Sequence, residues 1–390
     1  MPPRKSVKSS TPSSNSRPAT SARGLKAASD RLILAAADEL TGPEVLVVLM
    51  HGTTLASALR AARPDLRFTF YTPEHFFSRT LHSFNDDSSG DGAAECRIVC
   101  AADPPEGVWN SIVFPTFTTD SSEAAQELFQ TLHSRLKSCG RLFVSTNNPG
   151  DRWVRIQLRL LYAPVEVRKL PRGVLYIATR SIPLRKTRGF HARFGFRFHD
   201  RVLLCETRPG VFSHRKLDGG ARALIRSLDL IRDDVATGSF DSPLKIAEMG
   251  SGSGAVTVAA ASTFPAAQLL AVDSDARAID ATQRSANLNQ LTNIRTLLSS
   301  DGATEQPGTW DLVLGNPPYY SDFRIAELFL QTARKLLRPG GRIHIVSKPV
   351  DWPLARMRQL FTGVRQHTFG EYFVFTAVRT AGKSSEKHAD

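Results

Sequence analysis

The sequence predicts an α/β fold made of two tandem copies of one domain. Short apolar runs alternate with stretches of helical periodicity along most of the chain. Strands that alternate with helices form a parallel sheet joined by right-handed crossovers. The pattern is also written twice, since Val108–Phe117 matches Thr309–Tyr319 and Glu127–Thr146 matches Leu328–Ser347, both at a shift of 201 positions.

The repeat sets the expected domain boundaries. Few identities carry it, but the order of elements, their spacing and the strand ends agree between the copies. We expect a first domain over residues 30–181 and a second over residues 182–381, the second opening with a basic β extension. Met1–Ser29 is basic, rich in Ser and Pro and poor in large apolar residues, so it is expected to be a disordered tail, as are residues 382–390.

The elements of the second copy follow from short patterns. Near-continuous apolar runs predict buried strands, and longer amphipathic or Ala-rich runs predict helices. The Arg-Pro-Gly-Gly-Arg run at 338–342 predicts a helix stop with a left-handed glycine cap. The expected strands are Lys245–Met249, Gln268–Asp273, Asp311–Asn316 and Arg342–Ser347, and the expected helices are Ala255–Thr263, Ala276–Gln290 and Ile325–Leu337.

Composition limits the possible partners. The net charge of +13 favours a polyanionic partner, although a basic surface that only aids solubility is the alternative. The four cysteines are scattered without a CxxC pair, which argues against a zinc site and a disulfide framework and fits a reducing cytoplasm. No apolar run reaches the ~20 residues of a membrane span. The basic, Ser-rich start also suits an organelle transit peptide.

A glycine-rich turn in the second copy predicts a ligand site. Glu248 is followed by Gly250, Ser251, Gly252 and Gly254 between the first strand and the first helix. Glycine tolerates positive φ and lets backbone approach a ligand. The turn also satisfies GxGxxA, so a nicotinamide-binding domain is a rival interpretation. A carboxylate two residues before the first glycine suits an ammonium group better than a pyrophosphate.

Two acids and a proline-terminated strand distinguish a nicotinamide-binding domain from a site for a ligand with an ammonium group. Asp273 ends the second strand, where an acid can bind ribose hydroxyls, and Asp301 follows the next apolar stretch and can reach an adenine edge. Asn316-Pro317-Pro318-Tyr319 ends a further strand, because proline donates no ladder hydrogen bond. A dehydrogenase does not need this last motif.

Together these residues resemble the class I S-adenosylmethionine (AdoMet) methyltransferases. The resemblance implies that residues 248–254 form the AdoMet loop, with Asp273 on the ribose, Asp301 on the adenine and Asn316 beside the cofactor. It implies Rossmann-like domains, and Asn316 to Tyr319 resemble the (N/D)PP(Y/F) motif of enzymes that methylate a planar nitrogen. That nitrogen belongs to adenine, guanine or a glutamine amide in this group.

The chemistry explains the residue types in the motif. An amine conjugated to a ring is a weak nucleophile that gains positive charge during methyl transfer. The Asn316 oxygen and the Pro317 carbonyl can accept its two N–H bonds and stabilise that charge. Tyr319 offers a ring on which a flat base stacks, worth roughly 1–3 kcal/mol. We expect Asn316, Pro317 and Tyr319 to be catalytic, with Pro318 and Tyr320 in contact with substrate.

A degenerate first copy before an intact second copy resembles the bacterial rRNA guanine-N2 methyltransferases of the RsmC/RlmG type. The first copy has Met50–Thr54 in place of the glycine turn, Pro115 opposite Asn316 and Tyr71 close to the position of Asp273. We therefore expect it to bind no AdoMet and to serve substrate recognition or as a scaffold. Arg208–Leu228 also resembles a segment of that family, and its Asp218 is expected to cap the following helix.

The chain departs from the family in two places. Tyr319-Tyr320 follow the prolines where the family more often has Phe-His, and Val346–Pro353 replaces a frequent Ala-Asn-Arg. The identity of the base and the nearest RNA contacts are therefore less well defined than the methyl transfer.

Charge placement agrees with an RNA partner. Residues 152–201 contain 13 Lys and Arg, and Arg193 and Arg197 alternate with phenylalanines. Such segments neutralise phosphates and offer stacking faces, so both arginines are expected to bind substrate. The alternative is a basic β-hairpin with its phenylalanines packed inward, and the two can hold together.

The leading hypothesis is a monomeric, cytoplasmic enzyme that uses AdoMet to methylate the N2 amine of a guanosine in ribosomal RNA. An adenine-N6 or glutamine-N5 methyltransferase is the alternative among enzymes. A non-catalytic RNA-binding protein of ribosome assembly is the alternative from another class. No membrane or metal is expected.

Overall fold

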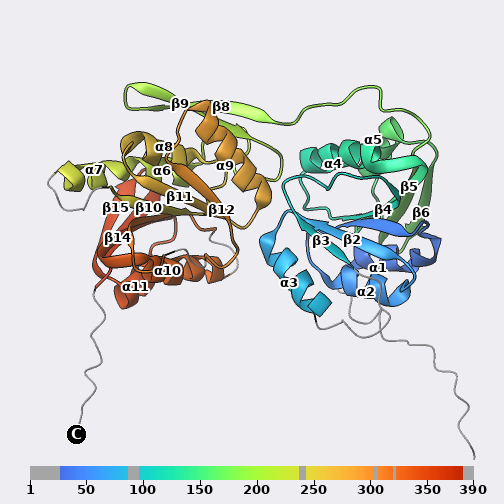
Figure 1. Cartoon of the computed structure of the whole chain (residues 1–390), viewed down its shortest axis with the longest axis horizontal. Coiled ribbons are helices and arrows are strands. Elements are labelled where there is room, and N and C mark those ends of the chain that lie inside the picture. Colours follow the sequence, from blue (N-terminus) through green and yellow to red (C-terminus); the bar gives the residue numbers. More distant parts are fainter. Residues whose placement is uncertain (1–26, 87–95, 237–242, 303–305, 319–321, 381–390) are drawn as a thin grey trace, which may run out of the picture.

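The structure is a computed structural model that describes residues 27–86, 96–236, 243–302, 306–318 and 322–380. Two α/β domains lie side by side, and an extended connection crosses between them (Figure 1). No helix in these described ranges is long and apolar enough to cross a membrane. The predicted fold of two α/β domains is confirmed, because the described residues form two seven-stranded sheets.

The first domain is built on a sheet of seven strands. The strand order is β3-β2-β1-β4-β5-β7-β6. Its first five strands are parallel, and β7 runs antiparallel to β5 and β6. The strands are β1 (Glu44–Val48), β2 (Arg67–Thr72), β3 (Arg97–Cys100), β4 (Trp109–Thr116), β5 (Leu136–Thr146), β6 (Val165–Leu170) and β7 (Gly173–Thr179).

The second domain repeats this topology strand for strand. Its order is β12-β11-β10-β13-β14-β16-β15, with β16 antiparallel to both of its neighbours. The predicted strands at 245–249 and 268–273 have the observed bounds. The strands are β10 (Lys245–Met249), β11 (Gln268–Asp273), β12 (Ile294–Leu298), β13 (Trp310–Gly315), β14 (Leu337–Ser347), β15 (Thr362–Phe369) and β16 (Tyr372–Val378).

Helices cover both faces of each sheet. In the first domain α1 and α2 bury one face and α4 and α5 the other. In the second domain α6, α7 and α8 bury one face and α10 and α11 the other. The helices are α1 (Ala28–Ala35), α2 (Thr54–Ala62), α3 (His75–Asp86), α4 (Ser122–Arg135), α5 (Trp153–Leu161), α6 (Gly219–Arg226), α7 (Leu228–Ala236), α8 (Ala255–Thr263), α9 (Ala276–Leu288), α10 (Arg324–Leu336) and α11 (Asp351–Leu360).

Two sequence-based boundaries were wrong in detail. The expected tail of residues 1–29 overlaps α1, which begins at Ala28, and Ser29 is fully buried. The run at 338–342 does not merely stop a helix, because β14 already begins at Leu337 and pairs there with Trp310 before the register shifts. Gly340 takes a positive φ of 81° within that irregular stretch. The rest of both tails lies outside the described residues.

The repeat extends to single hydrogen bonds. Thr72 Oγ1 accepts the Glu74 N–H at 3.2 Å, and 201 positions later Asp273 Oδ1 accepts the Asp275 N–H at 3.0 Å. Thr72 therefore holds the position of Asp273 in the first copy, and Tyr71 lies one position earlier. The first copy keeps the turn but replaces its acid with a hydroxyl.

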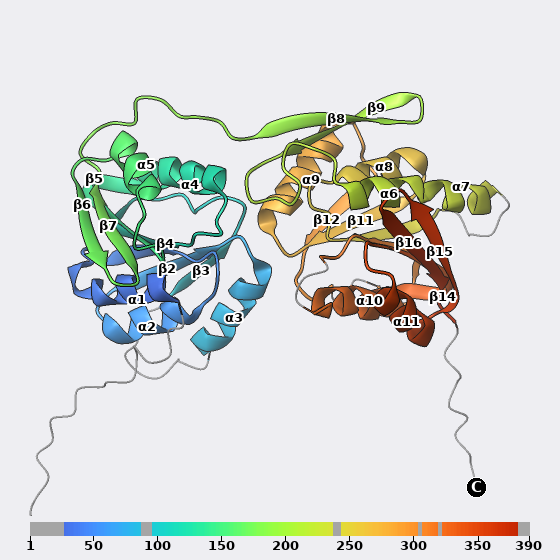
Figure 2. The ribbon, with the colours of Figure 1, turned by 180° about the vertical axis from the view of Figure 1, so that it is seen from behind.

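The same turn joins the two domains. His75 donates its N–H to the Ser274 carbonyl at 2.8 Å, and Ala276 donates to the Pro73 carbonyl at 2.9 Å. These two bonds are equivalent under the 201-residue shift, so the copies meet through one self-complementary surface, as in a twofold dimer. Both views place α3 and α9, which begin at these turns, between the two domains (Figure 1, Figure 2).

An antiparallel hairpin precedes the second sheet. It consists of β8 (Ala192–Phe198) and β9 (Arg201–Thr207). Phe196 and Phe198 are buried in the core of the second domain, whereas Arg193 and Arg197 are exposed. The alternation in the sequence thus separates an apolar face from a basic face, as the combined interpretation of this segment predicted.

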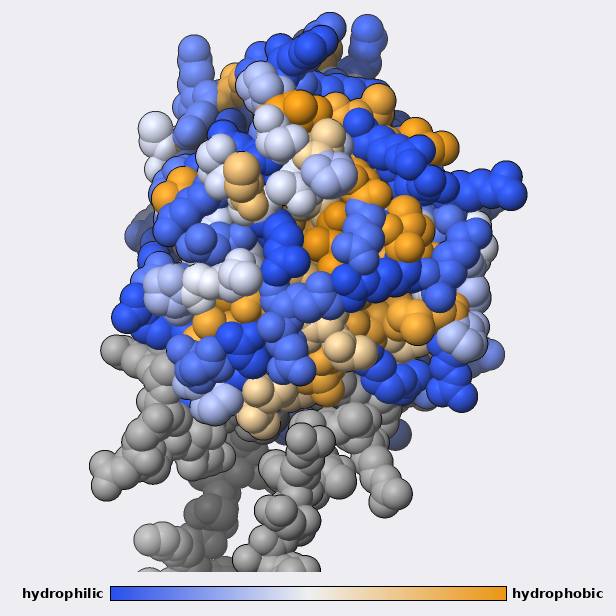
Figure 3. All heavy atoms as spheres, turned by 90° about the vertical axis from the view of Figure 1, so that its right-hand side faces the viewer, coloured by the Kyte–Doolittle hydropathy of each residue, from blue (hydrophilic) through white to orange (hydrophobic). Residues whose placement is uncertain are grey.

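The outer end of the first domain is of mixed polarity. Figure 3 shows apolar surface interspersed with charged side chains at the end that faces away from the second domain. Exposed apolar side chains of this domain include Ile156 and Leu160 of α5.

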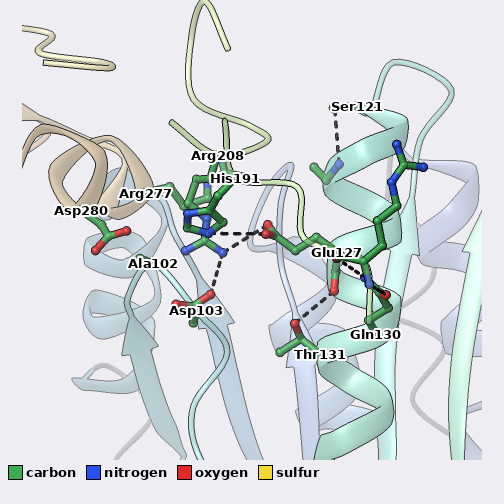
Figure 4. A network of polar contacts seen from close by, with 12 residues as sticks. Ala102, Asp103, Ser121, Glu127, Gln130, Thr131, His191, Arg208, Arg277 and Asp280 are labelled. Carbon is green, nitrogen blue, oxygen red and sulfur yellow. Dashed lines mark hydrogen bonds and ion pairs between the residues drawn. The ribbon is translucent and has the colours of Figure 1, made fainter. Parts of the chain in front are cut away.

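A buried arginine ties the domains together near the hairpin. Arg208 is 5% exposed, and its Nη2 donates to Asp103 at 2.6 Å and to Glu127 at 3.2 Å, both in the first domain. His191 lies beside it, 3.7 Å from a Glu127 oxygen (Figure 4). A buried guanidinium is stable only when such acceptors surround it.

We predict that Arg208→Ala loosens the contact between the domains. Hydrogen bonds to charged groups contribute about 1.5–3 kcal/mol each, so the loss of the two Arg208 bonds should lower the free energy of unfolding by about 3–6 kcal/mol. Chemical denaturation followed by circular dichroism measures it. Arg67→Ala is the control, because Arg67 and Glu44 form an ion pair in which both side chains are more than half exposed and such pairs stabilise little. Equal stability of Arg208→Ala and wild type contradicts this role.

Candidate functional site

The candidate site lies at the carboxyl ends of two neighbouring parallel strands. Met249, the last residue of β10, pairs with Gly315, the last residue of β13. The glycine turn and Asn316 begin one residue later on each strand, so they lie side by side. A Cβ added to Gly250 or to Gly315 would come within 3.0 Å of the Phe329 ring, so both positions need glycine.

The glycine turn has the backbone that only glycine adopts readily. Gly250, Gly252 and Gly254 have φ angles of 73°, 53° and 78°. Gly254 precedes α8, and a Cβ there would come within 2.9 Å of the Thr282 backbone. Gly252 faces open space, which a ligand can fill. Ser251 is buried and accepts a hydrogen bond from Thr282 at 3.0 Å.

Two acids lie at the same edge, Glu248 buried and Asp273 half-buried. Burial raises the pKa of Glu248 to about 8, and the Thr257 hydroxyl donates to its carboxylate. Burial also raises the pKa of Asp273 to about 6, and its Oδ2 accepts the Gly252 N–H at 2.9 Å. Two acids with raised pKa values at one strand edge fit a cationic ligand with hydroxyl groups, which is the character of AdoMet.

The first domain reaches the third acid. Asp301 follows β12, and Arg79 of α3 donates to its Oδ2. His75 accepts the Ser300 N–H through its Nδ1 at 3.1 Å. The structure thus brings Asp301 to the sheet edge that carries Asp273, and it adds two residues of the degenerate copy that sequence reasoning did not assign to this site.

The side chain of Asn316 is hydrogen-bonded to the residue that precedes α6. Its Nδ2 donates to Asp218 Oδ2 at 2.9 Å, and the same oxygen accepts the Ala221 N–H at 3.0 Å. Asp218 is therefore the N-cap of α6, as predicted. Pro317 is buried and Pro318 is half-buried, while Tyr319 and Tyr320 lie outside the described residues.

An aromatic pair flanks the same loop. Phe323 and Trp352 stack with ring centroids 4.6 Å apart and planes at 10°. Trp352 comes from the segment that departs from the family pattern, and nothing in its local sequence indicates a partner 29 positions earlier.

No described contact links Arg193 or Arg197 of the hairpin to the residues of the candidate site. Arg193 forms an ion pair with Glu206 at 2.7 Å, and Arg197 is exposed on β8. Their expected role in binding substrate stays a prediction. Among the residues that the structure describes, no group of His, Cys, Asp and Glu is arranged to hold a metal ion.

The second domain matches a known protein family. The family model described as "Methyltransferase small domain" matches residues 203–376, which hold the glycine turn, the three acids and the NPP loop. Residues 203–376 form a class I AdoMet-dependent methyltransferase domain. The methyltransferase core is therefore the second domain.

Two bacterial relatives match a large part of the chain in sequence. Ribosomal RNA small subunit methyltransferase C of Pseudomonas entomophila is 26% identical over 249 residues, which are 62% of this chain and 71% of that protein. Its namesake in Pseudoalteromonas translucida is 30% identical over 162 residues, 40% of this chain and 44% of that protein. The methyltransferase therefore resembles the RsmC type.

A solved structure extends the likeness to both domains. The T. thermophilus 16S rRNA N2 methyltransferase RsmC, in complex with AdoMet and guanosine, superposes with a TM-score of 0.71. The alignment covers 89% of this chain and 92% of that one at 20% identity. At this identity the likeness establishes a common fold for the methyltransferase, with two tandem Rossmann-like domains.

We predict that Glu248→Gln changes stability with pH in a defined direction. The folded chain keeps the Glu248 proton to about pH 8, whereas the unfolded chain releases it near its ordinary pKa of about 4.3. The folded state then binds more protons, so wild type without AdoMet loses stability relative to the variant as pH rises between these values. Urea denaturation of both proteins from pH 5 to 8.5 measures this difference.

The same variant should bind AdoMet at least about tenfold more weakly, because an amide does not compensate a cation. Glu106→Gln is the control, since the Glu106 side chain is 86% exposed. A stability difference that does not change with pH, together with unaltered AdoMet affinity, would remove Glu248 from the site.

Proposed function

We propose that this methyltransferase transfers a methyl group from AdoMet to the exocyclic N2 amine of a guanosine in ribosomal RNA. The observation that carries the proposal is the position of Asn316 beside the glycine turn, at paired strand ends. A carboxamide oxygen there accepts an N–H bond without carrying charge. The names of the relatives support ribosomal RNA as the substrate.

Different residues of the second domain bind different parts of AdoMet. Glu248 and Asp273 compensate its cation and hold its ribose, and Gly250 to Gly254 let backbone approach it. Asp301 faces the adenine, with Arg79 on its other side. When bound, AdoMet supplies an electrophilic methyl group on a sulfonium.

The NPP loop prepares the amine. The lone pair of an aromatic amine is delocalised into the ring, so the amine must be oriented and its developing positive charge stabilised. The Asn316 oxygen and the Pro317 carbonyl accept its two N–H bonds and turn the lone pair toward the methyl group. The proton leaves after transfer, so no strong general base is needed. Tyr319 stacks against the base, and Pro318 and Tyr320 contact the substrate.

The first domain serves as a scaffold and in substrate recognition. In place of the glycine turn it has Met50–Thr54, and in place of the acid it has Thr72. Basic residues of the connection and hairpin, including Arg193 and Arg197, contact phosphates. A base that is paired in a helix is extruded before it reaches Asn316. The enzyme acts as a monomer in the cytoplasm, where ribosomal RNA is available.

Two other functions use the same elements. An adenine-N6 or glutamine-N5 acceptor would fit the same pair of carbonyl oxygens, and a non-catalytic assembly factor would use only the basic surface. Mass spectrometry of ribosomal RNA digests and of peptides from candidate protein substrates, with and without the protein, separates them. N2-methylguanosine supports the proposal, whereas N6-methyladenosine, methylated glutamine in a protein substrate, or no methylation each supports an alternative.

We predict that Asn316→Ala lowers turnover by about 100-fold or more, because it removes one preorganised acceptor. AdoMet affinity should stay within about threefold, because the acids and glycines that hold the cofactor remain. Transfer of labelled methyl groups to ribosomal RNA measures turnover, and calorimetry measures affinity and stoichiometry.

Asn287→Ala is the matched control, since Asn287 is exposed on α9. One AdoMet per chain is expected, and two would contradict the degenerate assignment of the first domain. Full activity of Asn316→Ala would exclude Asn316 from the mechanism.

A further inference from the structure

The first turn of α6 borders the side chain of Asn316. Asp218 precedes this helix in an extended conformation, with φ −62° and ψ 149°. Its Oδ2 accepts two hydrogen bonds, from the Ala221 N–H at 3.0 Å and from Asn316 Nδ2 at 2.9 Å. One oxygen atom therefore caps the helix and binds the carboxamide.

This contact permits only one orientation of the carboxamide. An ionised carboxylate accepts hydrogen bonds and donates none. The atom of Asn316 that contacts Asp218 must then be the amide nitrogen, which can donate. A rotated amide would bring two oxygen acceptors together. The oxygen of Asn316 is thereby turned away from Asp218.

Gly220 supplies the space for this arrangement. A Cβ on Gly220 would lie 2.7 Å from Asn316 Oδ1 and 3.1 Å from Nδ2, so the amide packs directly against the helix backbone. Gly219 is needed for a different reason, because its Cβ would lie 2.5 Å from the Tyr372 ring. The pair of glycines after Asp218 thus fits a carboxamide on one side and an aromatic ring on the other.

We propose that Asp218 is a positioning residue that sets the Asn316 oxygen as the acceptor for the substrate amine. Gly220 allows the carboxamide to reach it. A hydrogen bond from the amide nitrogen to a charged acceptor also polarises the amide, which strengthens its oxygen as an acceptor. This inference rests on the proposed function of Asn316 and adds a residue from outside the NPP loop.

The primary test is Asp218→Ser. Serine caps helices as well as aspartate does, so α6 should remain folded, but its shorter side chain leaves the Asn316 nitrogen without its acceptor. We expect kcat to fall about 10- to 100-fold, with KM for RNA and AdoMet affinity within about threefold. A kcat equal to that of wild type overturns the proposal.

Two further variants test the orientation itself. Asp218→Asn keeps the cap but can face Asn316 with either an oxygen or an NH2 group, so it should lose less activity than Asp218→Ser. Gly220→Ala should lower kcat while AdoMet affinity is unchanged, because its methyl group displaces the amide. Either variant also keeps the proposal falsifiable if Asp218→Ser does not fold. Full activity of Gly220→Ala counts against it.

Ser121→Ala is the matched control for the loss of a cap. Ser121 caps α4 in the first domain by accepting the Ala124 N–H. This variant should lower stability without changing kcat. If it lowers kcat as much as Asp218→Ser does, the effect of Asp218 is only structural and the proposal fails.

A double variant separates this inference from the function itself. In the Asn316→Ala background Asp218→Ser should cause no additional loss, because Asp218 acts through Asn316. An equal additional loss overturns the inference and leaves the proposed function intact. If wild type transfers no methyl group to ribosomal RNA, the proposed function fails. The contact is then tested by the side-chain NH2 signals of Asn316 in NMR spectra, which should shift in Asp218→Ser.

Discussion

The pairing of β10 with β13 is the constraint on which the site depends. The chain order of the sheet reverses at this pair, because β10 is followed in the chain by β11 on one side and lies beside β13 on the other. The connections that follow β10 and β13 then run in opposite directions and leave a crevice at the carboxyl ends of these strands. Met249 opposite Gly315 brings Gly250 and Asn316 to that crevice from distant parts of the sequence. The position of Asn316 beside the glycine turn depends on this one register.

The degenerate copy shows which part of the pattern belongs to the fold and which to the chemistry. Its sheet has the same strand order, since order depends on buried apolar strands that the repeat preserves. The strand-end residues were free to change. Pro115, opposite Asn316, continues β4 and pairs with Ser145 rather than ending the strand. The turn that holds Asp273 in one copy holds Thr72 in the other, where it supports the contact between domains.

Much of the fold could be predicted because periodicity and the repeat are local signals. The glycine turn, Asp273 and Asn316 could be placed from the sequence for the same reason, because each lies at a strand end. What sequence could not supply was contact across elements. Asp218 was recognised as a helix cap, but its second bond to Asn316 joins residues 98 positions apart. The pairing of Arg79 with Asp301 depends on how the domains meet, and no pattern within either copy encodes it.

The arrangement around Asn316 also explains why a neutral residue stands at the strand end. An aspartate there would accept an N–H bond strongly, but it would pair with the sulfonium before reaction and stabilise the ground state as much as the transition state. A carboxamide avoids that pairing, at the expense of a weaker acceptor. In the proposed mechanism, the carboxylate of Asp218 behind the carboxamide restores acceptor strength through polarisation, without a charge in contact with the methyl donor.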